Sequence, residues 1–296
     1  MARRLLAIQG QDPRGARLAV RARTDGLHAS DVDAALNDRR LLIAWLNRGT
    51  LHLVRTADFW WLHALTTPQL RTGSDRRLAQ EGVTPAALRR GLDIVRDAIA
   101  ADGPQTREEL RERLRSSRVP TAGQALIHVL FRAGVEGLVV RGPMRGRQHC
   151  YVLAEDWAGE RPKVDRAVAL RELGTRYLAG HAPADDRDLA KWAGITLADA
   201  RRALADARPP RVPRHPDLPG PRLLGAFEPV LLGWADRTPI LPPDRQAEIV
   251  SGGIFRPFVL HHGRAAGAWR LERGRVLCDV PGALGAEKAD VERFLG

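Results

Sequence analysis

Apolar residues recur at helical spacing in the middle of the chain and are followed by a hairpin pattern. Thr84-Pro85 predicts a helix start, because threonine caps helices and proline fits their first position. Thr106, with Glu109 three residues later, predicts a second helix that opens with a capping box. A third helix is expected over residues 122–133, ended by Gly134 and followed by two apolar strands. Three helices followed by a hairpin predict a winged-helix unit over residues 81–158.

Two other stretches repeat this pattern in shorter form. Residues 1–80 combine helices expected after Asp12 and Asp31 with an alternating strand, and we expect this first unit to be truncated at its front. Residues 163–215 predict three helices without wing strands, ending in an extended basic loop. Residues 216–296 alternate like strands joined by glycine turns at Gly263 and Gly274. The predicted fold class is therefore α+β, with about three tandem winged-helix units and a C-terminal β-rich subdomain.

The charge of the chain points to a polyanionic partner. Its 296 residues include 47 Lys and Arg against 35 Asp and Glu, a net charge of +12, and only three of the basic residues are lysine. Arginine grips phosphates with a planar fork and stacks on bases. Richness in arginine and alanine can also reflect coding bias, but the surplus favours nucleic acid. Double-stranded DNA is the expected partner.

The winged-helix interpretation assigns DNA contacts to particular side chains. The third helix would enter the major groove, and the basic hairpin turn would lie against phosphates or the minor groove. Each assignment has an alternative: the hairpin turn is a solvated turn, His52 is a packed side chain, and the basic loop is a linker. The expected contacts are Arg14, Arg17 and Arg21 on the first helix, His52 in a strand, Gln124, His128 and Arg132 on the third helix, Arg141, Arg145 and Arg147 in the hairpin, and Arg211, Arg214 and His215 in the loop.

Several other classes of function find no support. Cys150 and Cys278 lack CxxC partners and fit inert thiols in a reducing cytosol. No apolar run approaches membrane-spanning length, so we expect a cytoplasmic protein. His261-His262 are expected on opposite faces of a strand, with no third ligand spaced for zinc. No glycine-rich nucleotide-binding string occurs. We therefore expect neither a metal nor a cofactor.

Five short strings occur in order along nearly the whole chain. They are QGQDP at 9–13, RGTLHLV at 48–54, DLAKWAG at 188–194, LLGWADR at 231–237 and GAWR at 267–270. Together they resemble the bacterial winged-helix DNA glycosylases that unhook interstrand crosslinks, in the branch with a Gln-x-Gln signature.

This resemblance implies an activity and a site. It implies tandem winged helices around a DNA channel and a monofunctional DNA glycosylase that hydrolyses the N-glycosidic bond of N7-alkylated purines. Alkylated or crosslinked DNA would be the substrate, in repair or toxin self-resistance. The signature corresponds to Gln9 and Gln11 as the catalytic pair, with Gly10 where the family usually has alanine or a larger apolar residue.

Two glutamines suit this reaction because the leaving group needs no acid. An N7-alkylguanine is already cationic, so what remains is to stabilise an oxocarbenium-like sugar and to place one water molecule. A glutamine carbonyl can accept a hydrogen bond from that water. Residues i and i+2 share a face only in an extended segment, and Asp12 is biased to extended geometry by Pro13. We therefore expect Gln9 and Gln11 to lie side by side.

Two other functions stay open at this point. Winged helices are more often regulators than enzymes, so a non-catalytic DNA-binding transcription regulator is the main alternative. Regulators normally dimerise, and no long dimerisation helix is apparent, so we expect a monomer. A degenerate relative that binds DNA weakly is the third hypothesis. Because the reacting groups are shared by monoadducts and crosslinks, the sequence does not identify the lesion.

Overall fold

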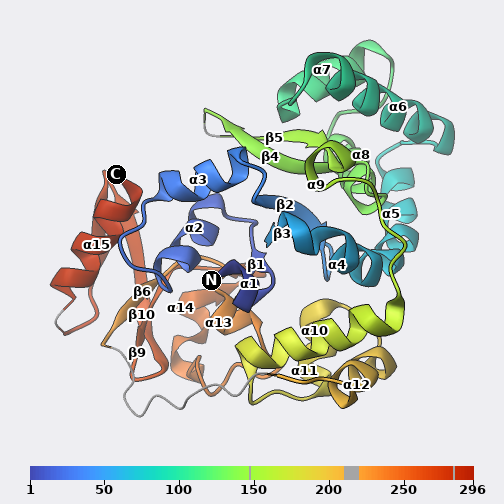
Figure 1. Cartoon of the computed structure of the whole chain (residues 1–296). Coiled ribbons are helices and arrows are strands. Elements are labelled where there is room, and N and C mark those ends of the chain that lie inside the picture. Colours follow the sequence, from blue (N-terminus) through green and yellow to red (C-terminus); the bar gives the residue numbers. More distant parts are fainter. Residues whose placement is uncertain (147, 210–219, 283) are drawn as a thin grey trace. The chain divides into compact units, whose positions relative to one another are not determined.

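The computed structural model describes residues 1–146, 148–209, 220–282 and 284–296 (Figure 1). Helices and strands are mixed along the chain, as the sequence predicts. Contacts divide the chain into two compact units: unit 1 joins residues 1–34 to residues 170–296, and unit 2 is residues 35–169. The predicted first segment, 1–80, is thus shared between the units. The domain boundaries expected from the sequence stay a prediction.

Unit 2 contains a sheet in which strands β3, β2, β4 and β5 are hydrogen-bonded in that order. The strands are β2 (Leu41–Leu46), β3 (Thr50–Arg55), β4 (Val139–Arg145) and β5 (Gln148–Leu153). β2 pairs antiparallel with β3 on one side and with β4 on the other, where Ile43 lies opposite Arg141. Two hairpins that are distant in sequence therefore form one sheet.

The helices of unit 2 include the three that the sequence predicts, which start at residues 85, 107 and 125, and others that were not predicted. They are α4 (Phe59–Thr66), α5 (Pro68–Gln80), α6 (Pro85–Asp102), α7 (Arg107–Ser116), α8 (Ala125–Val135) and α9 (Ala154–Ala158), with a short 3-10 turn η1 (Thr56–Asp58). The Thr84 side chain accepts a hydrogen bond from Ala87 N–H at the start of α6. Thr106 and Glu109 form the predicted capping box of α7. Both local predictions are confirmed.

The end of α8 and the turn of the hairpin differ from the prediction. The helix was expected to stop at Gly134 but continues to Val135. A Cβ on Gly134 would lie 2.5 Å from the Trp45 ring, so this glycine allows α8 to pack closely on β2. The hairpin strands are also longer than expected, which places Arg141 and Arg145 within β4 and not in a broad loop.

Unit 1 contains a sheet with the strand order β11-β10-β9-β6. The strands are β6 (Arg222–Leu224), β9 (Phe258–His261), β10 (Arg264–Glu272) and β11 (Arg275–Cys278). The glycine turns predicted at Gly263 and Gly274 join these strands, and both residues have positive φ. β7 (Val250–Ser251) and β8 (Ile254–Phe255) form a separate short pair. The C-terminal part is β-rich, as expected.

The remaining elements of unit 1 come from both ends of the chain. They are α1 (Ala2–Leu5), β1 (Ile8–Gln9), α2 (Pro13–Arg21), the start of α3 (Ala29–Asn37), α10 (Arg166–His181), α11 (Asp186–Ala193), α12 (Leu197–Ala205), α13 (Pro229–Leu232), η2 (Pro243–Arg245), α14 (Gln246–Ile249) and α15 (Gly285–Leu295). The last helix, red in Figure 1, packs against β11, β6 and α2. This contact ties the N-terminal helix to the C-terminal sheet.

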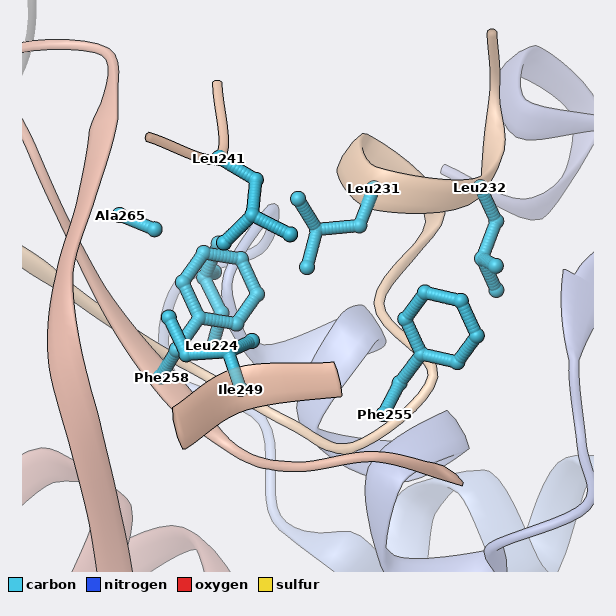
Figure 2. Close-up of a cluster of buried hydrophobic side chains, with 8 residues drawn as sticks. All are labelled: Leu224, Leu231, Leu232, Leu241, Ile249, Phe255, Phe258 and Ala265. Carbon is cyan, nitrogen blue, oxygen red and sulfur yellow. The ribbon is translucent and has the colours of Figure 1, made fainter. Parts of the chain in front are cut away.

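A cluster of buried apolar side chains forms the core of the C-terminal part (Figure 2). It consists of Leu224, Leu231, Leu232, Leu241, Ile249, Phe255, Phe258 and Ala265. Ala22, the residue after α2, packs against this cluster. Burial of such side chains stabilises the fold by about 1.5–3 kcal/mol each before entropy is counted. The helix that follows the glutamine motif is thereby attached to a packed core.

Candidate active site

The two glutamines of the motif lie side by side. Gln9 is the last residue of β1 and is only 7% exposed, whereas Gln11 is exposed. The Gln9 amide Nε2 donates a hydrogen bond to Gln11 Oε1. The expected shared face of residues i and i+2 is therefore confirmed. The contact fixes the orientation of the Gln9 amide relative to Gln11.

The carbonyl oxygen of Gln9 is a buried acceptor. Gln9 Oε1 has no hydrogen-bond partner among the residues that the structure describes. A buried carbonyl without a donor costs free energy, on the order of 1–3 kcal/mol, which a bound water molecule or ligand can offset. This atom can accept a hydrogen bond from a water molecule or a substrate hydroxyl.

The segment after the motif turns directly into helix α2. Asp12 has extended backbone angles (φ −104°, ψ 112°), and its Oδ1 accepts a 2.7 Å hydrogen bond from Gly15 N–H. Asp12 is thus the predicted N-cap, with Pro13 in the first turn. A Cβ on Gly15 would lie 2.3 Å from the Ala226 carbonyl oxygen. Only glycine lets this end of α2 lie so close to the chain after β6.

The far end of α2 is fixed by a buried arginine. Arg21, with a side chain 1% exposed, contacts Glu287 at 2.9 Å and Asp290 at 2.7 Å, and donates to the Leu223 carbonyl. Burial alone would raise the pKa of Glu287, but hydrogen bonds from Arg21 and from Leu223 N–H hold it below its usual value. The prediction that Arg21 faces a phosphate is wrong, because its guanidinium is enclosed by the protein.

The other two arginines of the predicted stripe have different surroundings. Arg17 is buried and forms an ion pair with Asp33, while its Nη1 donates to the Pro13 carbonyl. Its expected phosphate contact is therefore contradicted for the same reason as that of Arg21. Arg14 is exposed at the start of α2. Of the three, only Arg14 is accessible to DNA.

His52 is a buried, neutral side chain in β3. It is 3% exposed, and its Nδ1 lies 2.9 Å from the Thr50 carbonyl oxygen, to which the neutral ring donates. Burial lowers the pKa of His52 to about 4. The packed alternative for this residue is therefore favoured over a direct DNA contact.

Three side chains of α8 were expected in a DNA groove. Gln124 is exposed at the N-cap and His128 is half-buried. Arg132 has a side chain only 12% exposed and pairs with Asp75 and with Glu136, the latter at 2.9 Å. Its guanidinium also donates to the Arg71 carbonyl. Arg132 thus joins α8 to α5, which corrects its expected role in DNA reading.

The arginines of the β4–β5 hairpin also have partners within unit 2. The Arg141 guanidinium carbon lies 4.9 Å from the Trp45 ring centre and 5.1 Å from that of Tyr151, and Nη2 donates to the Tyr151 hydroxyl at 3.0 Å. Arg145 forms a 2.7 Å ion pair with Glu109 and stays half exposed. Arg141 is therefore a packing residue, while Arg145 retains some accessible surface.

Four of the expected DNA contacts lie outside the described residues. They are Arg147, Arg211, Arg214 and His215. Their assignment stays a prediction.

The described residues contain neither a cluster of metal-ligating side chains nor a helix of the membrane-spanning type. Within the described ranges, no three His, Cys, Asp or Glu side chains converge as a metal site requires. The rings of His261 and His262 lie 4.0 Å apart, which corrects the expectation of opposite faces: His262 has a φ of 48° and leaves the strand. In the same ranges, no helix has the length and hydropathy of a membrane span.

The C-terminal part holds the helix that follows the motif, a contribution that was not predicted from the sequence. Glu287 and Asp290, three residues apart on α15, hold Arg21 and thereby the helix after the motif. Glu228, the N-cap of α13, is fully buried and pairs with Arg23. The only sequence signal was an i, i+3 pair of carboxylates on a predicted helix. That pattern is common, so it did not identify a partner.

Comparisons with known proteins identify the family of this chain. The family model for AlkZ-like DNA glycosylases matches residues 2–293. An interstrand DNA cross-link repair glycosylase from Streptomyces sahachiroi is 28% identical over 308 aligned residues, covering 90% of this chain and 80% of the relative. The solved structure of the Streptomyces sahachiroi DNA glycosylase AlkZ has the same fold, with a TM-score of 0.72 at 23% identity, covering 98% of this chain and 89% of that one. The resemblance expected from the motifs is confirmed, and the chain belongs to the AlkZ-like DNA glycosylase family.

Proposed function

We propose that this glycosylase hydrolyses the N-glycosidic bond of N7-alkylated purines in double-stranded DNA and unhooks crosslinks formed at those purines. Membership of a DNA glycosylase family does not favour the alternative of a transcription regulator. The relative from Streptomyces sahachiroi is named as an interstrand cross-link repair enzyme. The observation that carries the proposal is the buried Gln9 carbonyl oxygen, which receives no hydrogen bond from any described residue. The amide nitrogen of the same side chain is hydrogen-bonded to Gln11.

The proposed roles of the two glutamines follow from their geometry. Gln9 Nε2 donates a hydrogen bond to Gln11, which holds Gln9 Oε1 in one orientation. Gln9 Oε1 can then accept a hydrogen bond from the attacking water molecule. Neither amide can protonate a leaving group. An N7-alkylated purine departs as a neutral base without protonation, so positioning the water and stabilising the cationic sugar suffice. Neutral purines, which need an acid, would be poor substrates.

The rest of the chain would supply DNA binding. The helices α6, α7 and α8, with the hairpin β4–β5, have the element order of a winged helix, and α10, α11 and α12 repeat its helical part. Gln124 and His128 remain accessible on α8 for contacts in a groove. The net charge of +12 favours a duplex partner. Action as a cytoplasmic monomer without a cofactor stays part of the proposal.

Base release from defined lesions tests this function. The substrates are a duplex with one 7-methylguanine and a duplex with an N7-linked interstrand crosslink. We expect release by the wild-type protein and a loss of about 10²-fold or more in Gln9→Ala, by analogy with the removal of one positioned hydrogen-bonding group. Gln11→Ala should lose less, since its side chain acts through Gln9.

The matched control is Gln80→Ala, an exposed glutamine at the end of α5. Binding of each variant to undamaged duplex should stay within about twofold of wild type, since neither glutamine carries charge. Wild-type rates in the Gln9→Ala/Gln11→Ala double variant would place catalysis elsewhere. No release of either lesion by the wild-type protein would refute the proposed substrate class.

A further inference from the structure

A pocket next to the glutamine motif brings together arginines from both ends of the chain. It has a volume of about 310 Å³ and lies within unit 1, between the start of α2 and the C-terminal sheet. Its polar and aromatic lining comes from Asp12, Arg14, Arg256, Trp269 and Arg270. Asp12 directly follows Gln11 in the sequence. The pocket therefore begins one residue away from the proposed catalytic pair.

The pocket has an excess of accessible positive charge. Arg14, Arg256 and Arg270 are all exposed. Among the described residues, the Arg256 guanidinium donates a single 3.3 Å hydrogen bond, to the Glu248 carbonyl. The ion pair of Arg270 with Glu272 is long, at 3.7 Å, between side chains 70% and 56% exposed. Such an exposed pair contributes little free energy and is readily exchanged. These guanidinium groups are available to an anion.

The acidic residue of the pocket does not cancel this charge. The Asp12 carboxylate is used as the N-cap of α2, where it accepts the Gly15 N–H hydrogen bond. Its charge is also opposed by the positive end of the nine-residue helix. Three arginines against one engaged carboxylate leave the pocket net positive. An anion is the ligand class that this lining favours.

The walls of the pocket are held rigidly. Gly15 lies so close to the chain at Ala226 that no Cβ fits between them. The Trp269 indole N–H donates to the Leu224 carbonyl at 2.8 Å, and its ring is 4% exposed. Trp269 N–H also donates to the Pro257 carbonyl at 3.1 Å, which joins the Arg256 segment to β10. A preformed site loses little entropy when it binds its ligand.

We infer that this pocket binds a backbone phosphate of the damaged DNA strand, close to the nucleotide whose base is removed. This inference rests on the proposed function and adds residues of the C-terminal sheet to it. Arginine forks match phosphate oxygens, and phosphate contacts fix the register of a protein on DNA. Anchoring a phosphate beside Gln11 would set the adjacent sugar against the Gln9 carbonyl. The C-terminal sheet thereby positions the substrate.

Salt-dependent DNA binding tests the pocket directly. The variant Arg256→Ala/Arg270→Ala is compared with Arg264→Ala/Arg171→Ala, which removes the same charge from exposed sites outside the pocket. Binding to an undamaged duplex of about 20 base pairs is measured by fluorescence anisotropy over roughly 50–200 mM salt, a range in which phosphate contacts dominate affinity. Each lost phosphate contact lowers the slope of log K against log salt by about 0.9.

We expect the slope of log K against log salt to be smaller by about one unit in the pocket variant, and its affinity at low salt to be about tenfold weaker. The slope of the control variant should change little. Equal slopes in the two variants would overturn the inference, since the loss would then be one of general charge. Melting temperatures within a few degrees of wild type would show that both variants fold.

The outcome is separable from that of the proposed function. Suppose that the wild-type protein released no base but the pocket variant had a smaller salt slope of DNA binding. The phosphate site would then stand and the proposed reaction would fall. If base release were present and the slope of the pocket variant were that of wild type, the reaction would stand and the phosphate site would fall.

Discussion

The arginines of the β4–β5 hairpin region and those of the pocket beside α2 have opposite environments. In unit 2, Arg132, Arg141 and Arg145 have carboxylate or aromatic partners within the protein. In unit 1, Arg256 and Arg270 are exposed and weakly paired. The sequence assigned DNA contacts to the first region but, within the second, only to Arg14. A basic residue in a DNA-binding motif is therefore not by itself a free cation.

Helix α2 shows the same contrast within nine residues. Arg14, Arg17 and Arg21 share one stripe by their spacing, yet only Arg14 is exposed. A buried guanidinium must be paired, because an unpaired charge inside the protein is very costly. The carboxylates Asp33 and Glu287 meet this requirement for the other two. Arg17 and Arg21 therefore attach the helix to the protein, whereas Arg14 presents its charge to solvent.

The largest effect is expected from breaking the buried end of this stripe. Arg21→Ala leaves Glu287 and Asp290 without their partner, which should cost about 3 kcal/mol of unfolding free energy or somewhat more. Arg14→Ala, in the same helix, should change stability by no more than about 0.5 kcal/mol. Urea unfolding followed by circular dichroism measures both. Equal losses in the two variants would show that the buried and exposed ends do not differ.

Acid should weaken the protein through buried histidines, which both units contain. Burial lowers the pKa of His52 and of His63, both in unit 2, to about 4, and that of His181 in unit 1 to about 4 as well. Between about pH 6.5 and 4, each binds a proton in the unfolded chain but not in the folded one. The free energy of unfolding therefore falls as the pH falls through that window.

One such histidine contributes about 1.4 kcal/mol for each pH unit in the window. Unfolding by urea at pH 8, 7, 6 and 5 should show this slope. The His52→Gln variant should have a shallower slope below pH 6.5, while above it the two proteins should differ by a constant amount. A slope unchanged by this substitution would argue that His52 is protonated in the folded state.

The smallest effect is expected at the hairpin. Arg145 and Glu109 have side chains 50% and 44% exposed, so Arg145→Ala should cost at most about 1 kcal/mol of stability. Because Glu109 shares this guanidinium, the salt slope of DNA binding should change less than in Arg256→Ala/Arg270→Ala. A larger change at Arg145 would make the hairpin, and not the pocket, the main phosphate contact.

Much of the secondary structure could be read from local signals. The caps at Asp12, Thr84 and Thr106 are used as predicted, and the glycine turns of the C-terminal sheet are in place. Each of these signals depends on residues within one turn of the chain. Gly134 was misread as a helix end, because the reason for that glycine is the Trp45 ring on a distant strand.

The candidate site was predictable only in part. The Gln9–Gln11 pairing follows from the extended segment before Pro13, and the order of the motifs pointed to the family. The burial of the Gln9 carbonyl could not be inferred, because it depends on how the folded chain encloses β1. The proposed roles of Arg256, which follows β8, and of Arg270, in β10, were not predicted, because nothing near them in the sequence distinguishes them from other surface arginines.

The sequence by itself determined the helix starts, the positive charge, the glutamine pair and the family. Those properties depend on composition or on residues close together in the chain. The tertiary structure decided which arginines are paired and which are free, and it joined residues 1–34 to the C-terminal sheet. Arg21 and Glu287 show the reason: an ion pair between residues at opposite ends of the chain depends on packing that no local pattern encodes.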